Sequence, residues 1–167
     1  MNLRYKKIQE KDISDLLLNN FSNLMAGFYE MQSSFLCWLY KRYTNIEAAN
    51  IILCLTKYKH LEIIRQRERN LDYDISFKNL WNNINEIEGT GQKIISIVNA
   101  TNIPKETVRR KIKNLITRNF VEFDKNTKVY YWKLKPKEKD IYFKIIEEDI
   151  DILSKFISIF CDHLNFK

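Results

Sequence analysis

Glycine and proline are scarce in this chain, which has three glycines and two prolines among its 167 residues. Long loops and β-sandwiches require many turn residues, so this scarcity argues against both and predicts a mainly helical fold. Histidine is equally scarce, with two residues. His60 and His163 stand far apart, and neither has a cysteine or carboxylate at ligand spacing. We therefore predict no metal site.

Cysteine is also sparse, with a widely spaced and odd-numbered set at Cys37, Cys54 and Cys161. The chain has no CxxC motif, and we expect no signal peptide. This pattern predicts reduced thiols and a cytoplasmic protein, with all three cysteines interpreted as core residues.

Patterns typical of catalysis are missing too. Gly89-Thr-Gly91 is not followed by the Gly-Lys-Ser/Thr sequence of a phosphate-binding loop. The acidic residues 147–149 and Asp151 fall on a predicted helix, where they indicate a solvated face. No nucleophile has a base at a suitable spacing. The protein is therefore predicted not to be an enzyme, and no cofactor is expected.

One stretch is unusually apolar. Residues 12–40 hold a helical spacing and predict a single long helix, in which Glu30 is the only charge between Leu16 and Tyr40. A membrane span is one alternative. Its asparagine, glutamine and serine residues interrupt the run of about 20 apolar residues that a span requires. We therefore prefer the alternative that the same helix of a second copy of the chain covers its apolar surface.

Further helices are expected from their caps and spacing. Thr44-Asn45 can cap a helix from Ile46 to about Asn70, and Ser76 is a suitable cap for a short helix over 77–87. A last helix is predicted from Pro136 to about Leu164.

Two helices and a tight turn are predicted within 93–118. The second helix starts at Pro104, a residue suited to a first helical turn. Asn102 suits the left-handed conformation that a tight turn needs. The second helix carries an apolar stripe at helical spacing, formed by Val108, Ile112 and Leu115.

A β-hairpin is predicted directly after these helices. Beyond Asn119 the hydrophobic period changes to two residues, and aromatic and β-branched side chains fill 120–123 and 129–134. The polar residues 124–128 supply the turn. Helix, turn, helix and hairpin in this order are typical of a winged helix-turn-helix.

The segment Ile103–Arg110, with the sequence IPKETVRR, resembles the start of the recognition helix in bacterial winged-helix regulators of the catabolite-activator, GntR and MarR groups. Asn102 stands where these groups usually have glycine, and Asn119 where glycine often precedes the wing. No segment resembles the cyclic-nucleotide β-barrel of the catabolite-activator group. The resemblance covers roughly a quarter of the chain and implies a DNA-binding module without that group's effector.

Positive charge is concentrated in the same region. Residues 91–137 hold 12 Lys and Arg against 3 Asp and Glu, a net charge of +9, whereas the whole chain carries +7. The other 120 residues are therefore slightly acidic, at −2. A localised excess of this kind is the electrostatic pattern expected of a surface that contacts phosphates.

Nine residues are the candidate DNA contacts. By the resemblance, Lys105, Glu106 and Arg110 match base-reading positions and Thr107 matches a phosphate contact. Arg110 would bind guanine O6 and N7, and Glu106 would accept from cytosine N4. The helix supplies three further candidates, and the hairpin tip two that would touch the backbone or the minor groove: Arg109, Lys113 and Thr117, and Lys125 and Lys128.

Ordinary structural roles are the alternatives. A basic helix face can simply be solvated, and lysines at a hairpin tip are common in turns. Tyr130, Tyr131 and Trp132 are expected to pack the sheet rather than to stack on bases.

The prediction is a mainly α protein in which long terminal helices bracket a winged helix-turn-helix with a small hairpin wing. Residues 1–45 and 137–167 would form dimerisation helices. Residues 46–136 would form the DNA-binding domain, with the helix-turn-helix core at 93–118 and the wing at 120–134.

The expected function is sequence-specific binding of double-stranded DNA by a homodimeric transcription regulator, with half-sites about one DNA turn apart. A winged-helix protein of replication initiation or plasmid maintenance is one alternative, and a protein-interaction module is another. A pocket between the terminal helices and the module is the candidate place for a small-molecule effector.

Overall fold

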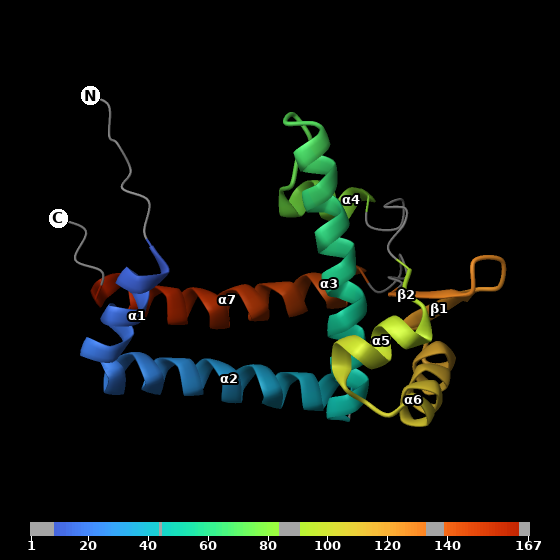
Figure 1. Ribbon diagram of the computed structural model, residues 1–167, viewed down its shortest axis with the longest axis horizontal. Helices are drawn as coiled ribbons and strands as arrows, with labels where there is room; N and C mark the ends of the chain where they lie inside the picture. The colour runs from blue at the N-terminus through green and yellow to red at the C-terminus, as the bar shows by residue number, and fades with distance from the viewer. Residues whose placement is uncertain (1–8, 44, 84–90, 133–138, 164–167) are drawn as a thin grey trace. The chain divides into compact units, whose positions relative to one another are not determined.

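The computed structural model describes residues 9–43, 45–83, 91–132 and 139–163 (Figure 1). Within these residues the fold is mainly helical, with seven helices and one antiparallel two-stranded hairpin after the sixth. The predicted mainly α class is confirmed. The chain divides into two compact units, residues 1–38 with 141–167 and residues 39–140.

The first unit contains α1 (Glu10–Asn19), most of α2 (Phe21–Tyr43) and α7 (Lys139–His163). Helices α2 and α7 run antiparallel and side by side (Figure 1). Gly27 allows them to approach closely, because a Cβ there would lie 3.2 Å from Cδ1 of Ile159. Phe28 packs on Phe156, with ring centroids 5.9 Å apart.

The single helix predicted over 12–40 is wrong, because Asn20 separates α1 from α2. Both the backbone N–H and the side-chain amide of Asn20 donate to the carbonyl of Leu16, at 3.0 and 3.2 Å. Asparagine side chains compete in this way for backbone groups and so favour helix ends over helix interiors. Over the residues that the structure describes, no helix is long and apolar enough to cross a membrane.

The cysteine prediction is confirmed for one residue and wrong for two. All three are free thiols, but only Cys54 is buried, and burial raises the pKa of its thiol. Cys37 and Cys161 lie on exposed sides of α2 and α7.

The second unit contains the end of α2, then α3 (Ile46–Arg69), α4 (Phe77–Asn83), α5 (Ile94–Thr101), α6 (Lys105–Thr117) and the hairpin of β1 (Val121–Asp124) and β2 (Val129–Trp132). Helices α3, α5 and α6 pack against one another, β1 lies against α6, and β2 lies against α3. The fully buried side chains of this core come from all three helices: Ile51, Leu55, Ile97, Val108, Ile112 and Leu115.

Two predicted caps are confirmed. The side chain of Asn45 accepts from the backbone N–H of Ala48 at 3.1 Å. The hydroxyl of Ser76 accepts from the backbone N–H of Asn79 at 3.3 Å. Residues 84–90, which include the end of the predicted helix 77–87, lie outside the described residues. Residues 133–138 and Leu164 also lie outside them. They include the end of the predicted wing and both ends of the predicted last helix, Pro136 and Leu164.

Candidate nucleic-acid interface

The turn between α5 and α6 is set by Asn102. Its φ of 55° and ψ of 19° are left-handed, and its N–H donates to the carbonyl of Val98 at 2.9 Å. The predicted conformation of Asn102 is confirmed. Pro104 is displaced by one position from its predicted place, since it precedes the first residue of α6 as the N-cap with φ −54°. Its fixed φ still suits the entry into the helix.

This turn can be tested by substitution at Asn102. We expect Asn102→Ala to lower the free energy of unfolding by about 1 kcal/mol, because a Cβ without a local hydrogen-bonding group is disfavoured at positive φ. Asn102→Gly is the matched control and should cost much less, because glycine adopts this conformation freely. Urea unfolding followed by circular dichroism measures both. Equal losses for the two variants would contradict this account of the turn.

Helix α6 presents one face to the core and the opposite face to solvent. Val108, Ile112 and Leu115 are buried on the inner side. The predicted contact residues lie away from this stripe; Thr107 is half-buried, and the others are exposed: Lys105, Glu106, Arg109, Arg110, Lys113 and Thr117. The structure therefore brings the six exposed candidates together on the solvent-facing surface of one helix.

The polar groups on this surface differ in how far they are already paired. The carboxylate of Glu106 forms an ion pair with the guanidinium of Arg109 one turn later. The hydroxyl of Thr117 donates to the carbonyl of Lys113 at 3.0 Å. Lys105, Arg110 and Lys113 have no carboxylate partner among the described residues. These three cations are consequently the ones that can bind an anion without first breaking an ion pair.

The hairpin carries the remaining two candidates, Lys125 and Lys128, both exposed in its four-residue loop. Asp124 holds this loop by accepting from the hydroxyl of Thr127 and from the N–H of Asn126. These hydrogen bonds, that of Thr127 foremost, lower the pKa of the Asp124 carboxyl. Asp124 is therefore ionised at neutral pH and fixes the loop from which both lysines project.

The segment around Gln92 pairs with the hairpin, and the sequence analysis did not predict this contact. Gln92 and Tyr130 exchange two backbone hydrogen bonds of 2.8 Å. A Cβ at Gly91 would lie 2.4 Å from Cγ2 of Val129, so only glycine fits there without a shift. The hairpin is thus tied at its base to the segment that leads into α5.

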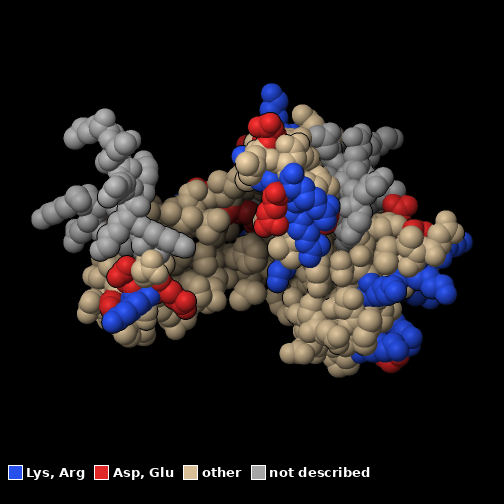
Figure 2. Space-filling model, turned by 45° about the horizontal axis from the view of Figure 1, so that its top comes forward, with Lys and Arg blue, Asp and Glu red and all other residues tan. Residues whose placement is uncertain are grey.

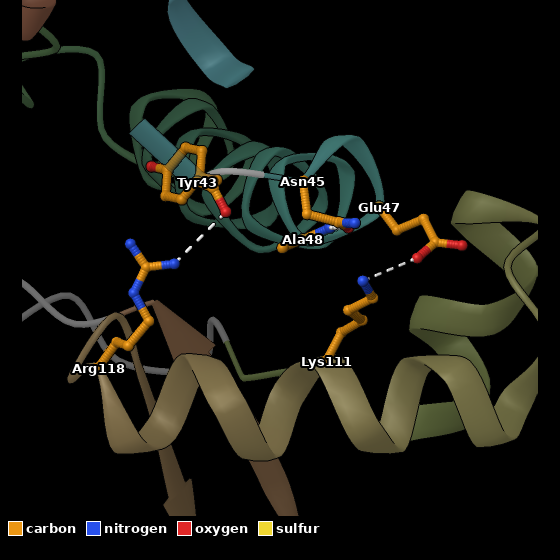
Figure 3. A network of polar contacts seen from close by, with 6 residues as sticks. All are labelled: Tyr43, Asn45, Glu47, Ala48, Lys111 and Arg118. Atoms are coloured by element: carbon orange, nitrogen blue, oxygen red, sulfur yellow. Dashed lines mark hydrogen bonds and ion pairs between the residues drawn. The ribbon is translucent and has the colours of Figure 1, made fainter. Parts of the chain in front are cut away.

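Two basic residues of the same region anchor α6 to the start of α3 and the end of α2 (Figure 3). The ammonium of Lys111 lies 3.1 Å from the carboxylate of Glu47, and its side chain is only 15% exposed. The guanidinium of Arg118 donates to the carbonyls of Arg42 and Tyr43 at 3.2 and 3.4 Å. A cation at these carbonyls also suits the negative end of a helix.

Sequence reasoning counted Lys111 and Arg118 as part of a basic surface and assigned neither a role. Arg118 also lies over the ring of Phe120, 5.0 Å from its centroid, and Phe120 contacts Tyr43 edge-on at 5.3 Å. The contacts of Arg118 and Phe120 with the end of α2 join segments more than 70 residues apart in the chain. They fix the orientation of α6, and the positive charge of Arg118 therefore has a structural role.

A cleft of about 560 Å³ lies beside α6, between that helix and the start of α3. Its α6 wall includes Arg110, Lys113 and Asn114, and its other wall includes Tyr43 and Asn45. Figure 2 shows Lys and Arg side chains gathered over the part of this unit where α6 and the hairpin lie. A second group lies over the C-terminal part of α3. The charged surface of α6 is therefore partly hollowed.

The comparisons with known proteins give no independent assignment. No family model, no curated protein and no solved structure matches the chain significantly.

Proposed function

We propose that residues 46–136 form a winged helix-turn-helix domain that binds double-stranded DNA, and that the chain acts as a homodimeric transcription regulator. Helix α6 is the recognition helix, and the β1–β2 hairpin is the wing. The observation that carries this proposal is a set of exposed cations on α6 and at the hairpin tip that form no ion pair with the described residues: Lys105, Arg110, Lys113, Lys125 and Lys128.

The arrangement of elements supports the same proposal. Helices α3, α5 and α6 pack together, and the tight turn at Asn102 joins the last two. The hairpin follows α6 directly and is bridged at Gln92 to the segment before α5. Helix-turn-helix proteins place the second helix of such a pair in the major groove, with base contacts from its N-terminal residues. Lys105 and Glu106 occupy those positions here.

Dimerisation through the terminal helices is supported by the apolar surface of the first unit. Among its described residues, only Leu24 is a fully buried large side chain. Large apolar side chains about half exposed occur on all three of its helices: Leu18, Phe21, Tyr29, Leu36, Phe143, Ile150, Leu153 and Ile157. Apolar surfaces of this kind mark interaction sites. A second copy of the same helices would cover them.

The test is binding of a fluorescent random-sequence duplex across a series of salt concentrations. Wild type should bind with an affinity that falls steeply with salt, because cations of the protein displace counterions from phosphates. The variant Lys105→Ala/Arg110→Ala/Lys113→Ala should lower the slope of log K against log salt by about 0.9 for each phosphate that the protein no longer neutralises.

The matched control is Lys57→Ala/Arg65→Ala/Arg69→Ala, which removes the same charge from exposed residues of α3. It should leave the slope nearly unchanged. Equal effects of the two variants would show that binding is diffuse and not centred on α6. Absence of wild-type binding at low salt would refute the proposed function, and an acidic protein partner would then be the better explanation of the basic face.

A further inference from the structure

We propose that the cleft between α6 and the start of α3 holds a backbone phosphate of the DNA duplex, with Arg110 and Lys113 as its ligands. This inference rests on the proposed function. It differs from the expectation drawn from the sequence, in which Arg110 reads guanine. Base reading is then left to Lys105 and Glu106, at the start of α6.

The first argument is the position of the cleft. An α-helix with its side chains is about 10–12 Å wide and fills a major groove about 12 Å wide. The flanks of a helix in the groove therefore face the two sugar–phosphate strands. The cleft runs along one flank of α6, with Arg110, Lys113 and Asn114 on that wall and residues around the start of α3 on the other. A DNA group that enters this cleft therefore belongs to a sugar–phosphate strand and not to a base edge.

The second argument is the charge of the cleft. The carboxylate nearest in sequence to its α3 wall, that of Glu47, is held by Lys111 at 3.1 Å. Arg110 and Lys113 have no carboxylate partner among the described residues, so the cleft is left positive. A concave surface of one charge concentrates the potential and favours an anion more than a flat surface does.

The third argument is that neutral donors complete the site. Asn114 lies on the α6 wall, and its side-chain amide is a neutral donor. Asn45 lines the other wall; its side-chain oxygen accepts from the N–H of Ala48, so its NH₂ group is the donor that it can offer to a ligand. Asparagine amides and basic side chains are the usual protein donors to phosphate oxygens. A volume of about 560 Å³ also leaves room for the adjoining sugar atoms.

The anchors described above keep this cleft in shape. Lys111 closes one end of the α6–α3 contact through Glu47, and Arg118 closes the other through the carbonyls at the end of α2 (Figure 3). Arg110 and Lys113 lie close to these two tethers in sequence. The phosphate ligands are thus presented by a helix whose position is fixed before DNA binds, which reduces the cost of ordering them.

The experiment compares two duplexes of equal length, one selected by wild type from a random pool and one with the same bases scrambled. Affinities are measured over a salt series for wild type, Arg110→Ala, Arg110→Lys and the control Lys57→Ala. Arg110→Ala should weaken binding by the same factor on both duplexes and lower the salt slope by about 0.9. Arg110→Lys should keep the wild-type slope, because a point charge suffices for a phosphate.

Other outcomes overturn the inference. If Arg110→Ala and Arg110→Lys both lose the preference for the selected duplex, Arg110 reads a base by bidentate contact. If both variants bind as wild type does, the cleft is not used although the proposed function stands. If wild type itself binds neither duplex, the proposed function fails as well.

A free phosphate ion is the other source of the same chemistry. Titration of wild type with inorganic phosphate, followed by the amide resonances of Asn114 and Asn45, should show only weak binding. Saturable binding that is abolished in Arg110→Ala, with DNA affinity unchanged, would make the cleft a site for free phosphate and overturn the assignment to DNA.

Discussion

Replacing Leu115 by alanine is expected to lower the free energy of unfolding by about 2–5 kcal/mol. Leu115 is fully buried on α6, in the contact of that helix with α3 and α5. The substitution removes apolar atoms from the core and leaves a cavity that a tightly packed interior fills only partly. Urea unfolding followed by circular dichroism measures the change.

Ile116→Ala is the matched control, since Ile116 is the next residue of the same helix and is 36% exposed. It removes a side chain of the same size from a site that water already reaches in part, and alanine is the better helix former. The loss of stability should therefore be about 1 kcal/mol or less. Comparable losses at the two positions would show that Leu115 does not stand at the centre of a packed core.

The parts of this fold that the sequence predicts are those set by short-range signals. The left-handed turn at Asn102, the cap at Asn45 and the change of period after Asn119 all act within a few residues. The resulting elements α5, α6 and the hairpin lie where their patterns placed them. The apolar stripe predicted on α6 is the buried side of that helix, and six of the seven candidate residues on α6 are exposed.

Local competition explains the helix break that the sequence analysis missed. The apolar spacing through 12–40 continues across Asn20, but a single asparagine that donates to the carbonyl of Leu16 is enough to separate α1 from α2. Hydrophobic periodicity indicates which face of a helix is buried. It does not reveal such a break, because the apolar stripe continues on the following helix.

Long-range contacts explain the parts of the site that the sequence analysis did not resolve. In the sequence alone, nothing distinguishes the roles of the three basic residues Lys111, Lys113 and Arg118. In the structure Lys111 pairs with Glu47 and Arg118 donates to the carbonyl of Tyr43, whereas Lys113 faces the cleft. Which basic residue is structural and which can bind a ligand depends on segments 60 or more residues away, and no spacing rule contains that information.

Lys59 is the clearest case in which the sequence held an unused signal. It follows Leu55 and precedes Ile63 at four-residue spacing, on the buried stripe of α3. The structure leaves it only 5% exposed, with its ammonium 5.9 Å from the centroid of the Trp132 ring. Burial penalises the charged form and lowers the pKa of Lys59 to about 8.

This burial predicts a dependence of stability on pH. An unfolded lysine has a pKa near 10.5, so between about pH 8 and 10.5 the unfolded chain binds more protons at Lys59 than the folded chain does. The contribution of Lys59 to stability therefore rises with pH across this window and is least favourable below pH 8. Lys59→Met should stabilise the protein below pH 8 by on the order of 2–3 kcal/mol, and this gain should vanish above pH 10.5.

The measurement is the free energy of unfolding of wild type and Lys59→Met from pH 7 to 10.5, with Arg69→Met as the control. Cys54 and Tyr131 also have raised pKa values, from burial in the first place, and their ionisation favours the unfolded state as pH rises. That trend has the opposite sign and is common to all three proteins, so the difference between variant and wild type isolates Lys59. Arg69 is exposed on the same helix and keeps its charge over this pH range, so its replacement should give a difference that does not change with pH. A difference for Lys59→Met that is equally flat would mean that Lys59 keeps an ordinary pKa and that α3 meets the hairpin without burying a titrating charge.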